Sequence, residues 1–220
     1  MTYIAGVVEA SSVLEDLSRR RSVFHSEADL QHAFAWSIQQ LVPSLEIRLE
    51  VLTWTQDKRR QHLDLLCWGD RGRTAIELKY IKAAWDGNDP ITGENVQLLP
   101  HAADDLARRD FVFDIARLER VCAMEEQPTD GLAVMLTNVK AMWSAPAHGR
   151  PTRDRNFRVH DGRTLSGSLV WGEGDFSAND RDLSGTYTVE WRRYCQLPGR
   201  NGDFRWLAIP IAAVSSGRAV

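Results

Sequence analysis

The 220-residue chain is poor in cysteine and has no long apolar run. Its three cysteines, Cys67, Cys122 and Cys195, are odd in number and lack metal-ligand spacing, which favours a reducing cytoplasm over a disulfide-rich secreted protein. The longest apolar run, residues 206–214, contains Pro210 and is far too short to cross a bilayer, so we expect no membrane partner. The first residues show no basic-then-apolar signal pattern.

Several catalytic signatures are missing as well. The sequence contains no Gly-rich phosphate loop and no Gly-x-Ser-x-Gly elbow, and its six histidines show no zinc-ligand spacing. The net charge of −3 indicates no overall basic surface, so nucleic acid would have to bind through a local patch or through metal ions. A chain of this length suits one α/β domain with a sizeable core.

The most informative segment that is present is the alternating run of residues 76–80. Glu77 and Lys79 fall on one face of the predicted strand, while its apolar residues fall on the other. Charged groups inside a buried strand are costly unless they are used, so this pair indicates a functional site. Only four of the 27 basic residues are lysines. Lysine is a compact cation whose pKa shifts readily on burial, which adds weight to its choice here.

A second carboxylate, Asp64, lies on the preceding predicted strand, across the turn at residues 69–72. If Gly69 faces Gly72, Asp64 lies opposite Glu77 on the same face, with Cβ atoms about 4.5–5.5 Å apart. Opposed carboxylates destabilise a sheet unless a cation compensates them, and Mg²⁺ prefers such oxygens while keeping waters for a phosphate. A bulge would slip the register and move Asp64 to the other face. The alternative is a strand with exposed charges on its solvent side.

A third carboxylate, Glu27, is expected at the start of a helix. Ser26 is typical of an N-cap, and the helical run continues to about Leu41 before Pro43. The apolar stripe of this helix consists of Leu30, Phe34, Ile38 and Leu41. Glu27 begins the same inward stripe, so it either joins the site or stabilises the helix N-terminus through the helix dipole.

Taken in order, these segments resemble a known signature. Residues 25–31 (HSEADLQ), 63–66 (LDLL) and 76–80 (IELKY) look like the motifs of the PD-(D/E)xK nuclease superfamily, the restriction-endonuclease-like fold. The resemblance covers about residues 22–140, and Leu63 stands where the superfamily usually has Pro. It implies an α/β fold with a mixed β-sheet flanked by helices.

The resemblance also implies a set of roles. Asp64 and Glu77 would ligate Mg²⁺, with Mn²⁺ able to substitute, and Glu27 would be an accessory metal ligand. Lys79 would position or activate the attacking water. The function implied is a metal-dependent nuclease that hydrolyses phosphodiester bonds of nucleic acid, with DNA favoured over RNA.

Other elements surround this predicted core. A strand is expected over residues 46–51, with Ile47, Leu49 and Val51 inward, and a buried strand over 131–136. The breaker-rich residues 85–94 are typical of a mobile loop over a cleft. A long helix is expected over residues 101–126. Its arginines alternate with acids, which favours a solvated face over a phosphate-binding one; these are Arg108, Arg109, Arg117 and Arg120.

From Gly149 onward the composition shifts, and we interpret residues 149–220 as a β-rich extension packed on the core within a single domain spanning 1–220. Clustered arginines are the candidates here for contact with nucleic-acid phosphates, namely Arg150, Arg153, Arg155, Arg158 and Arg163. The aromatics that punctuate the extension can stack on bases, but filling a core is the better explanation; they are Trp171, Tyr187, Trp191, Tyr194 and Trp206.

The leading hypothesis is therefore a cytoplasmic Mg²⁺-dependent nuclease. A catalytically inactive nuclease-fold module for nucleic-acid binding or protein assembly is the alternative, and hydrolysis of a small phosphate ester is a third. A homodimer would present two sites to two strands, although no residue pattern identifies a dimer surface.

Overall fold

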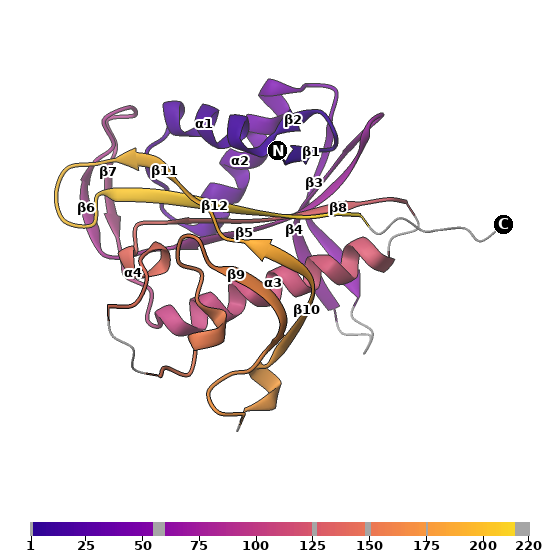
Figure 1. Ribbon diagram of the computed structural model, residues 1–220. Coiled ribbons are helices and arrows are strands. Elements are labelled where there is room, and N and C mark those ends of the chain that lie inside the picture. Colours follow the sequence, from indigo (N-terminus) through magenta and orange to yellow (C-terminus); the bar gives the residue numbers. More distant parts are fainter. Residues whose placement is uncertain (1, 55–59, 125–126, 148–150, 175, 214–220) are drawn as a thin grey trace.

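The computed structural model describes residues 2–54, 60–124, 127–147, 151–174 and 176–213. Within these ranges six strands form one sheet (Figure 1), in the spatial order β11 (Trp191–Gln196), β12 (Asp203–Ile211), β8 (Asp130–Thr137), β5 (Gly72–Ile81), β4 (Arg60–Gly69) and β3 (Glu46–Trp54). Neighbours are antiparallel except β5 and β8, which are parallel. The predicted mixed sheet is confirmed.

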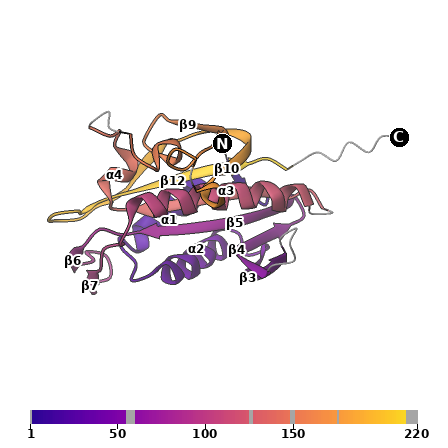
Figure 2. The same ribbon diagram turned by 90° about the horizontal axis from the view of Figure 1, so that it is seen from below.

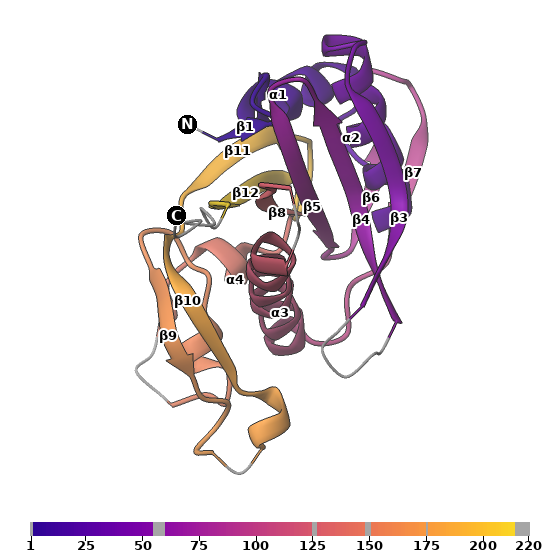
Figure 3. The same cartoon turned by 90° about the vertical axis from the view of Figure 1, so that its right-hand side faces the viewer.

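Helices cover both faces of this sheet. On one face lie α1 (Ala10–Arg20) and α2 (Glu27–Leu41), and on the other lies α3 (Asp104–Met124). Figure 2 shows α2 and α3 on opposite sides of β5. The parallel pairing of β5 with β8 requires a crossover connection, and α3 supplies it. The α3 face also carries the two-stranded sheet of β9 (Thr164–Leu169) and β10 (Arg181–Thr188), which packs against α3 (Figure 3).

The remaining elements of the described residues are short. They are β1 (Tyr3–Ile4), β2 (Val8–Glu9), β6 (Trp85–Asn88), β7 (Asn95–Leu98), α4 (Lys140–Trp143) and two 3₁₀ turns, η1 (Arg155–Phe157) and η2 (Ser177–Asn179). The expected loop at residues 85–94 is wrong in its first part, because β6 pairs with β7. The buried Trp85 packs edge-on against Phe204 and so anchors this hairpin to the core.

The N-terminal helix of the predicted motif forms as expected. Ser26 caps α2, and its Oγ accepts a hydrogen bond from the Asp29 backbone N–H at 3.1 Å. The expected stripe residues Leu30, Phe34 and Ile38 are fully buried. Leu41, predicted inward as well, is 40% exposed, so the buried stripe ends one turn before the helix does.

Strand β3 departs from its predicted alternation. Ile47 packs on the α1–α2 side and Val51 on the α3 side, while Leu49 is exposed, so the expectation that all three point inward was wrong. The cause is Glu50, whose φ of 52° lies in the left-handed region and turns the strand over.

The C-terminal segment is divided between two places. Strands β11 and β12 extend the central sheet beside β8, whereas β9 and β10 pack on α3. The expectation that its aromatics fill the core is confirmed, because five of them are buried: Trp171, Tyr187, Trp191, Tyr194 and Trp206. No helix in the described ranges is long and apolar enough to cross a membrane.

Candidate active site

The β4–β5 hairpin has the register that the sequence predicts. Gly69 pairs with Gly72, and the pairing continues to Leu65 and Ile76. The backbone ladder between the two strands ends there, one residue short of Asp64. The strands therefore separate at the position where the two predicted metal ligands would come together.

The separation follows from the change of face in β3 and β4. Leu65 and Cys67 pack on the α1–α2 side of the sheet, but Leu63 packs on the α3 side. A regular strand would place all three on one face, so β4 turns over at Asp64. Leu49 pairs with Leu65, which places the left-handed Glu50 of β3 across from this turning point.

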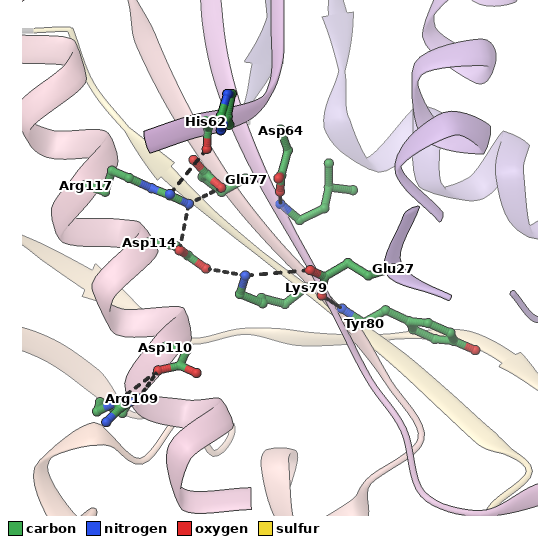
Figure 4. A network of polar contacts seen from close by, with 11 residues as sticks. Glu27, His62, Asp64, Glu77, Lys79, Tyr80, Arg109, Asp110, Asp114 and Arg117 are labelled. Carbon is green, nitrogen blue, oxygen red and sulfur yellow. Dashed lines mark hydrogen bonds and ion pairs between the residues drawn. The ribbon is translucent and has the colours of Figure 1, made fainter. Parts of the chain in front are cut away.

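Beyond the end of the β4–β5 ladder, two carboxylates accept hydrogen bonds from backbone N–H groups of β5 (Figure 4). Asp64 Oδ2 accepts a hydrogen bond from the Leu78 N–H at 2.7 Å. Glu27 Oε2 accepts one from the Tyr80 N–H at 2.9 Å. The first turn of α2 thus takes the place of a strand beside β5. Both acids have a structural reason to be where they are, in addition to any chemical one.

Glu77 and Lys79 share one face of β5, as predicted, and on that face they meet two side chains of α3 (Figure 4). Lys79 Nζ is 3.2 Å from Asp114 Oδ2 and 3.8 Å from Glu27 Oε1. Arg117 Nη2 is 2.9 Å from Asp114 Oδ1 and also forms an ion pair with the Glu77 carboxylate. Glu77 is only 1% exposed, so this ion pair lies inside the protein.

The charges of this cluster shift one another's pKa values. Burial shifts the pKa of Glu77 upward, the Arg117 and Lys79 charges oppose this shift, and Asp64 and Asp114 add to it. Burial also raises the pKa of Asp114 to about 6 against the opposing charges of Lys79 and Arg117. Burial lowers the pKa of Lys79, but the carboxylates of Asp114, Glu27 and Asp64 raise it above its usual value. Asp64 is therefore close enough to act electrostatically on all three.

The donor set fits a hard divalent cation in one respect. Mg²⁺ is commonly held by one or two carboxylates and completes its shell with waters and substrate phosphates. Asp64 and Glu77 supply two carboxylates; Glu77 Oε2 is paired with Arg117, whereas its Oε1 has no hydrogen-bond partner among the described residues. Buried polar oxygens without such partners are rare, which is consistent with a ligand that completes the site.

Glu27 does not converge with these two. Within the described ranges, no three His, Cys, Asp or Glu side chains approach one another closely enough to hold a metal ion. The Glu27 carboxylate is instead occupied by the Tyr80 N–H and by Lys79. His62 meets this cluster through its backbone carbonyl, which accepts a hydrogen bond from Arg117 Nη1 at 3.3 Å.

Two residues of the cluster, Asp114 and Arg117, are missing from the sequence-based site. Their three-residue spacing places them on one helix face, together with Asp110 one turn earlier. The alternating charges of this segment predict a solvated surface, and for Asp114 and Arg117 that prediction is wrong. Only the packing of α3 on β5 shows that it faces Glu77 and Lys79.

Two of the predicted phosphate-binding arginines of the extension form ion pairs with nearby acids. Arg150 lies outside the described residues. Arg153 forms an ion pair with Asp105, and Arg158 Nη2 lies 3.3 Å from Asp154 Oδ1. Arg155 is exposed in η1. None of the three described arginines lines the cleft beside Lys79.

That cleft has a volume of about 310 Å³ and opens between β4, β5, α3 and β10. Its lining is mostly charged and consists of Gln61, Lys79, Asp110, Phe113, Asp114, Arg117, Arg120 and Arg181. Lys79, Asp114 and Arg117 belong to the cluster around Glu77, so the cleft connects this cluster to solvent. No known protein-family model, curated protein or solved structure matches this chain.

Proposed function

We propose that the protein is a divalent-metal-dependent nuclease with a restriction-endonuclease-like core, acting on nucleic acid with DNA as the favoured substrate. One observation carries this proposal: β4 and β5 separate between Asp64 and Glu77, whose charges still act on each other, and Lys79 beside Glu77 lines a cleft rich in cations. Phosphodiester hydrolysis needs acidic ligands for a metal and a cation near the phosphate, and this cluster contains both.

Asp64 and Glu77 are the residues that would hold Mg²⁺, or Mn²⁺ in its place. When bound, such an ion supplies Lewis-acid activation of the phosphate and lowers the pKa of the attacking water. Lys79 stabilises negative charge that develops on the phosphate. Asp114 and Glu27 lie on either side of its ammonium group and restrict its position, which is the role we assign to Glu27.

Arg117 has a distinct role in this proposal. Its guanidinium neutralises Glu77 in the arrangement described above, so it must leave that carboxylate before the carboxylate can ligate a metal. Arg117 also lines the cleft, where a phosphate offers an alternative partner. We therefore propose that Arg117 passes from Glu77 to the substrate phosphate when metal and substrate bind.

A cleavage panel tests the proposal. Wild-type protein is mixed with single- and double-stranded DNA and with RNA, with Mg²⁺, with Mn²⁺ and with a chelator. Glu77→Gln should remove metal-dependent cleavage while circular dichroism and Tm remain those of a folded protein. Glu46→Gln, the same change at a carboxylate that is 62% exposed on β3, should cleave like wild type. Wild-type protein that cuts none of these substrates with either ion would refute the nuclease.

The second candidate is a catalytically inactive nuclease-fold module for nucleic-acid binding or protein assembly. The ion pair of Arg117 with Glu77 favours it, because an internal cation at this carboxylate removes the need for a metal. Titration calorimetry with Mn²⁺ separates the two candidates. A catalytic site binds Mn²⁺ and loses that binding on Asp64→Ala, whereas an inactive module gives no binding heat with either protein.

A further inference from the structure

The cations of the cleft beside Lys79 are not equally compensated. Lys79 and Arg117 both contact Asp114, as described above. The remaining lining acid, Asp110, forms an ion pair with Arg109 at 2.7 Å. Both acids of the cleft are thus already engaged with cations.

Arg120 and Arg181 remain without a carboxylate. In the described part of the chain, neither of them forms an ion pair, although both line the same cleft. Burial lowers the pKa of Arg181, and the nearby charges of Arg120 and Arg109 lower it further. Like charges that approach one another without a counter-ion are unfavourable, and an anion bound between them would relieve this repulsion.

The fold holds Arg181 in place, whereas the Arg120 side chain is exposed on α3. The Arg181 guanidinium stacks on the Phe113 ring, with its Cζ 3.6 Å from the ring centroid. Its Nη1 donates a hydrogen bond to the Asp180 backbone carbonyl at 3.1 Å. A guanidinium has five N–H donors, so others remain for a ligand. Arg120 follows Arg117 by three residues and lies beside it on α3.

From this arrangement we infer that Arg120 and Arg181 form a binding site for a backbone phosphate of a nucleic-acid strand, next to the phosphate held at Lys79. The inference rests on the proposed function for the identity of the ligand. It places a phosphate-contacting surface in the cleft formed by α3 and β10, apart from the predicted C-terminal arginine cluster. Planar guanidinium groups suit the paired oxygens of a phosphodiester.

The test measures binding of a fluorescein-labelled single strand and of its duplex by anisotropy, in the presence of a chelator so that no cleavage occurs. The proteins compared are wild type, Arg120→Gln, Arg181→Gln and the double variant. Each lost phosphate contact should reduce the slope of log K against log salt for the single strand by about 0.7. At roughly 0.1 M salt the loss of this one phosphate contact corresponds to about fivefold weaker binding, which the double variant should reach in full.

Three controls accompany these variants. Arg19→Gln makes the same change on α1, on the opposite face of the sheet, at a side chain that is 69% exposed, and should leave binding unchanged. Arg181→Lys keeps the charge without the stacked plane and should retain most of the salt dependence. A methylphosphonate strand has the same bases without backbone charge, so the wild type and the double variant should bind it alike.

The outcomes separate this inference from the proposed function. If the double variant binds the single strand and the duplex with wild-type affinity and salt dependence, the phosphate site does not exist, whether or not the protein cleaves. If the wild type depends on Arg120 and Arg181 for binding but never cleaves under any divalent ion, the phosphate site stands and the nuclease is refuted.

Discussion

Replacing Arg117 with Met should destabilise the metal-free protein and at the same time improve its binding of Mn²⁺. The guanidinium of Arg117 is the cation that contacts both Glu77 and Asp114, and these side chains are 1% and 9% exposed. Met keeps much of the aliphatic volume but leaves Glu77 without its nearest positive charge. The substitution therefore tests the electrostatic role of Arg117 with little change in packing.

The size of the effect follows from burial. Removing one partner of a buried ion pair costs about 3–5 kcal/mol, and we expect about 3 kcal/mol because the Arg117 side chain is itself 19% exposed. For a chain of this length, about 2–4 °C of Tm corresponds to each kcal/mol, so the Tm should fall by roughly 6–12 °C. Mn²⁺ at about 100 times its Kd stabilises a folded protein by about 2.7 kcal/mol and should restore most of this loss.

Wild type should gain less from the same ion, because binding at Glu77 must first displace Arg117. If that displacement costs about 1.4 kcal/mol, Arg117→Met binds Mn²⁺ about tenfold more tightly than wild type. Thermal unfolding with a chelator and with Mn²⁺, together with calorimetry, measures both effects. Arg120→Met, on the same helix but without a carboxylate partner among the described residues, should change stability by no more than about 0.5 kcal/mol. An Arg117→Met protein with wild-type Tm and no added gain from Mn²⁺ would refute this reasoning.

Three further changes have defined outcomes. Asp64→Ala leaves the Leu78 N–H without its acceptor and should cost about 1–3 kcal/mol in urea unfolding, whereas Asp64→Asn keeps an acceptor and should be nearly neutral; equal losses would contradict this role. Asp154→Ala leaves Arg108 buried without its carboxylate and should cost about 3–5 kcal/mol, against about 0.5 kcal/mol for the exposed Asp182→Ala. Burial raises the pKa of Asp29, but hydrogen bonds from Arg21 and the His25 N–H hold it below its usual value. Its contribution to stability is therefore present above about pH 4 and lost as the pH falls through that lowered pKa, so Asp29→Asn should weaken the acid dependence of Tm.

The buried Arg108–Asp154 ion pair connects α3 to the segment before η1. Arg108 also donates to the Ala141 carbonyl at 3.2 Å. Its sequence neighbours Arg109 and Asp105 are part of the alternating charges that predict a solvated helix face. Local charge alternation therefore does not distinguish an exposed arginine from one that a distant acid holds inside the protein.

Much of the framework was determined by local sequence. The two-residue period of the strands and the turn at Gly69 and Gly72 set the hairpin register, because a slip of one residue would reverse the buried and exposed faces. The cap at Ser26 and the helical spacing of Leu30, Phe34 and Ile38 likewise predict α2. Helix α1 was not predicted, although the spacing of its buried apolar residues carried the same kind of signal.

Only the tertiary structure decided how the site is assembled. Nothing in the period of β3 indicates the left-handed Glu50, and this residue lies where the β4–β5 ladder ends and Asp64 turns toward Leu78. The ion pairs of Arg117 and the lack of a carboxylate beside Arg120 depend on which surfaces α3 and β10 present to the sheet. Periodicity reports which face of an element is buried, but not which charged groups meet across that face. Such meetings join residues far apart in the chain, and packing alone selects them.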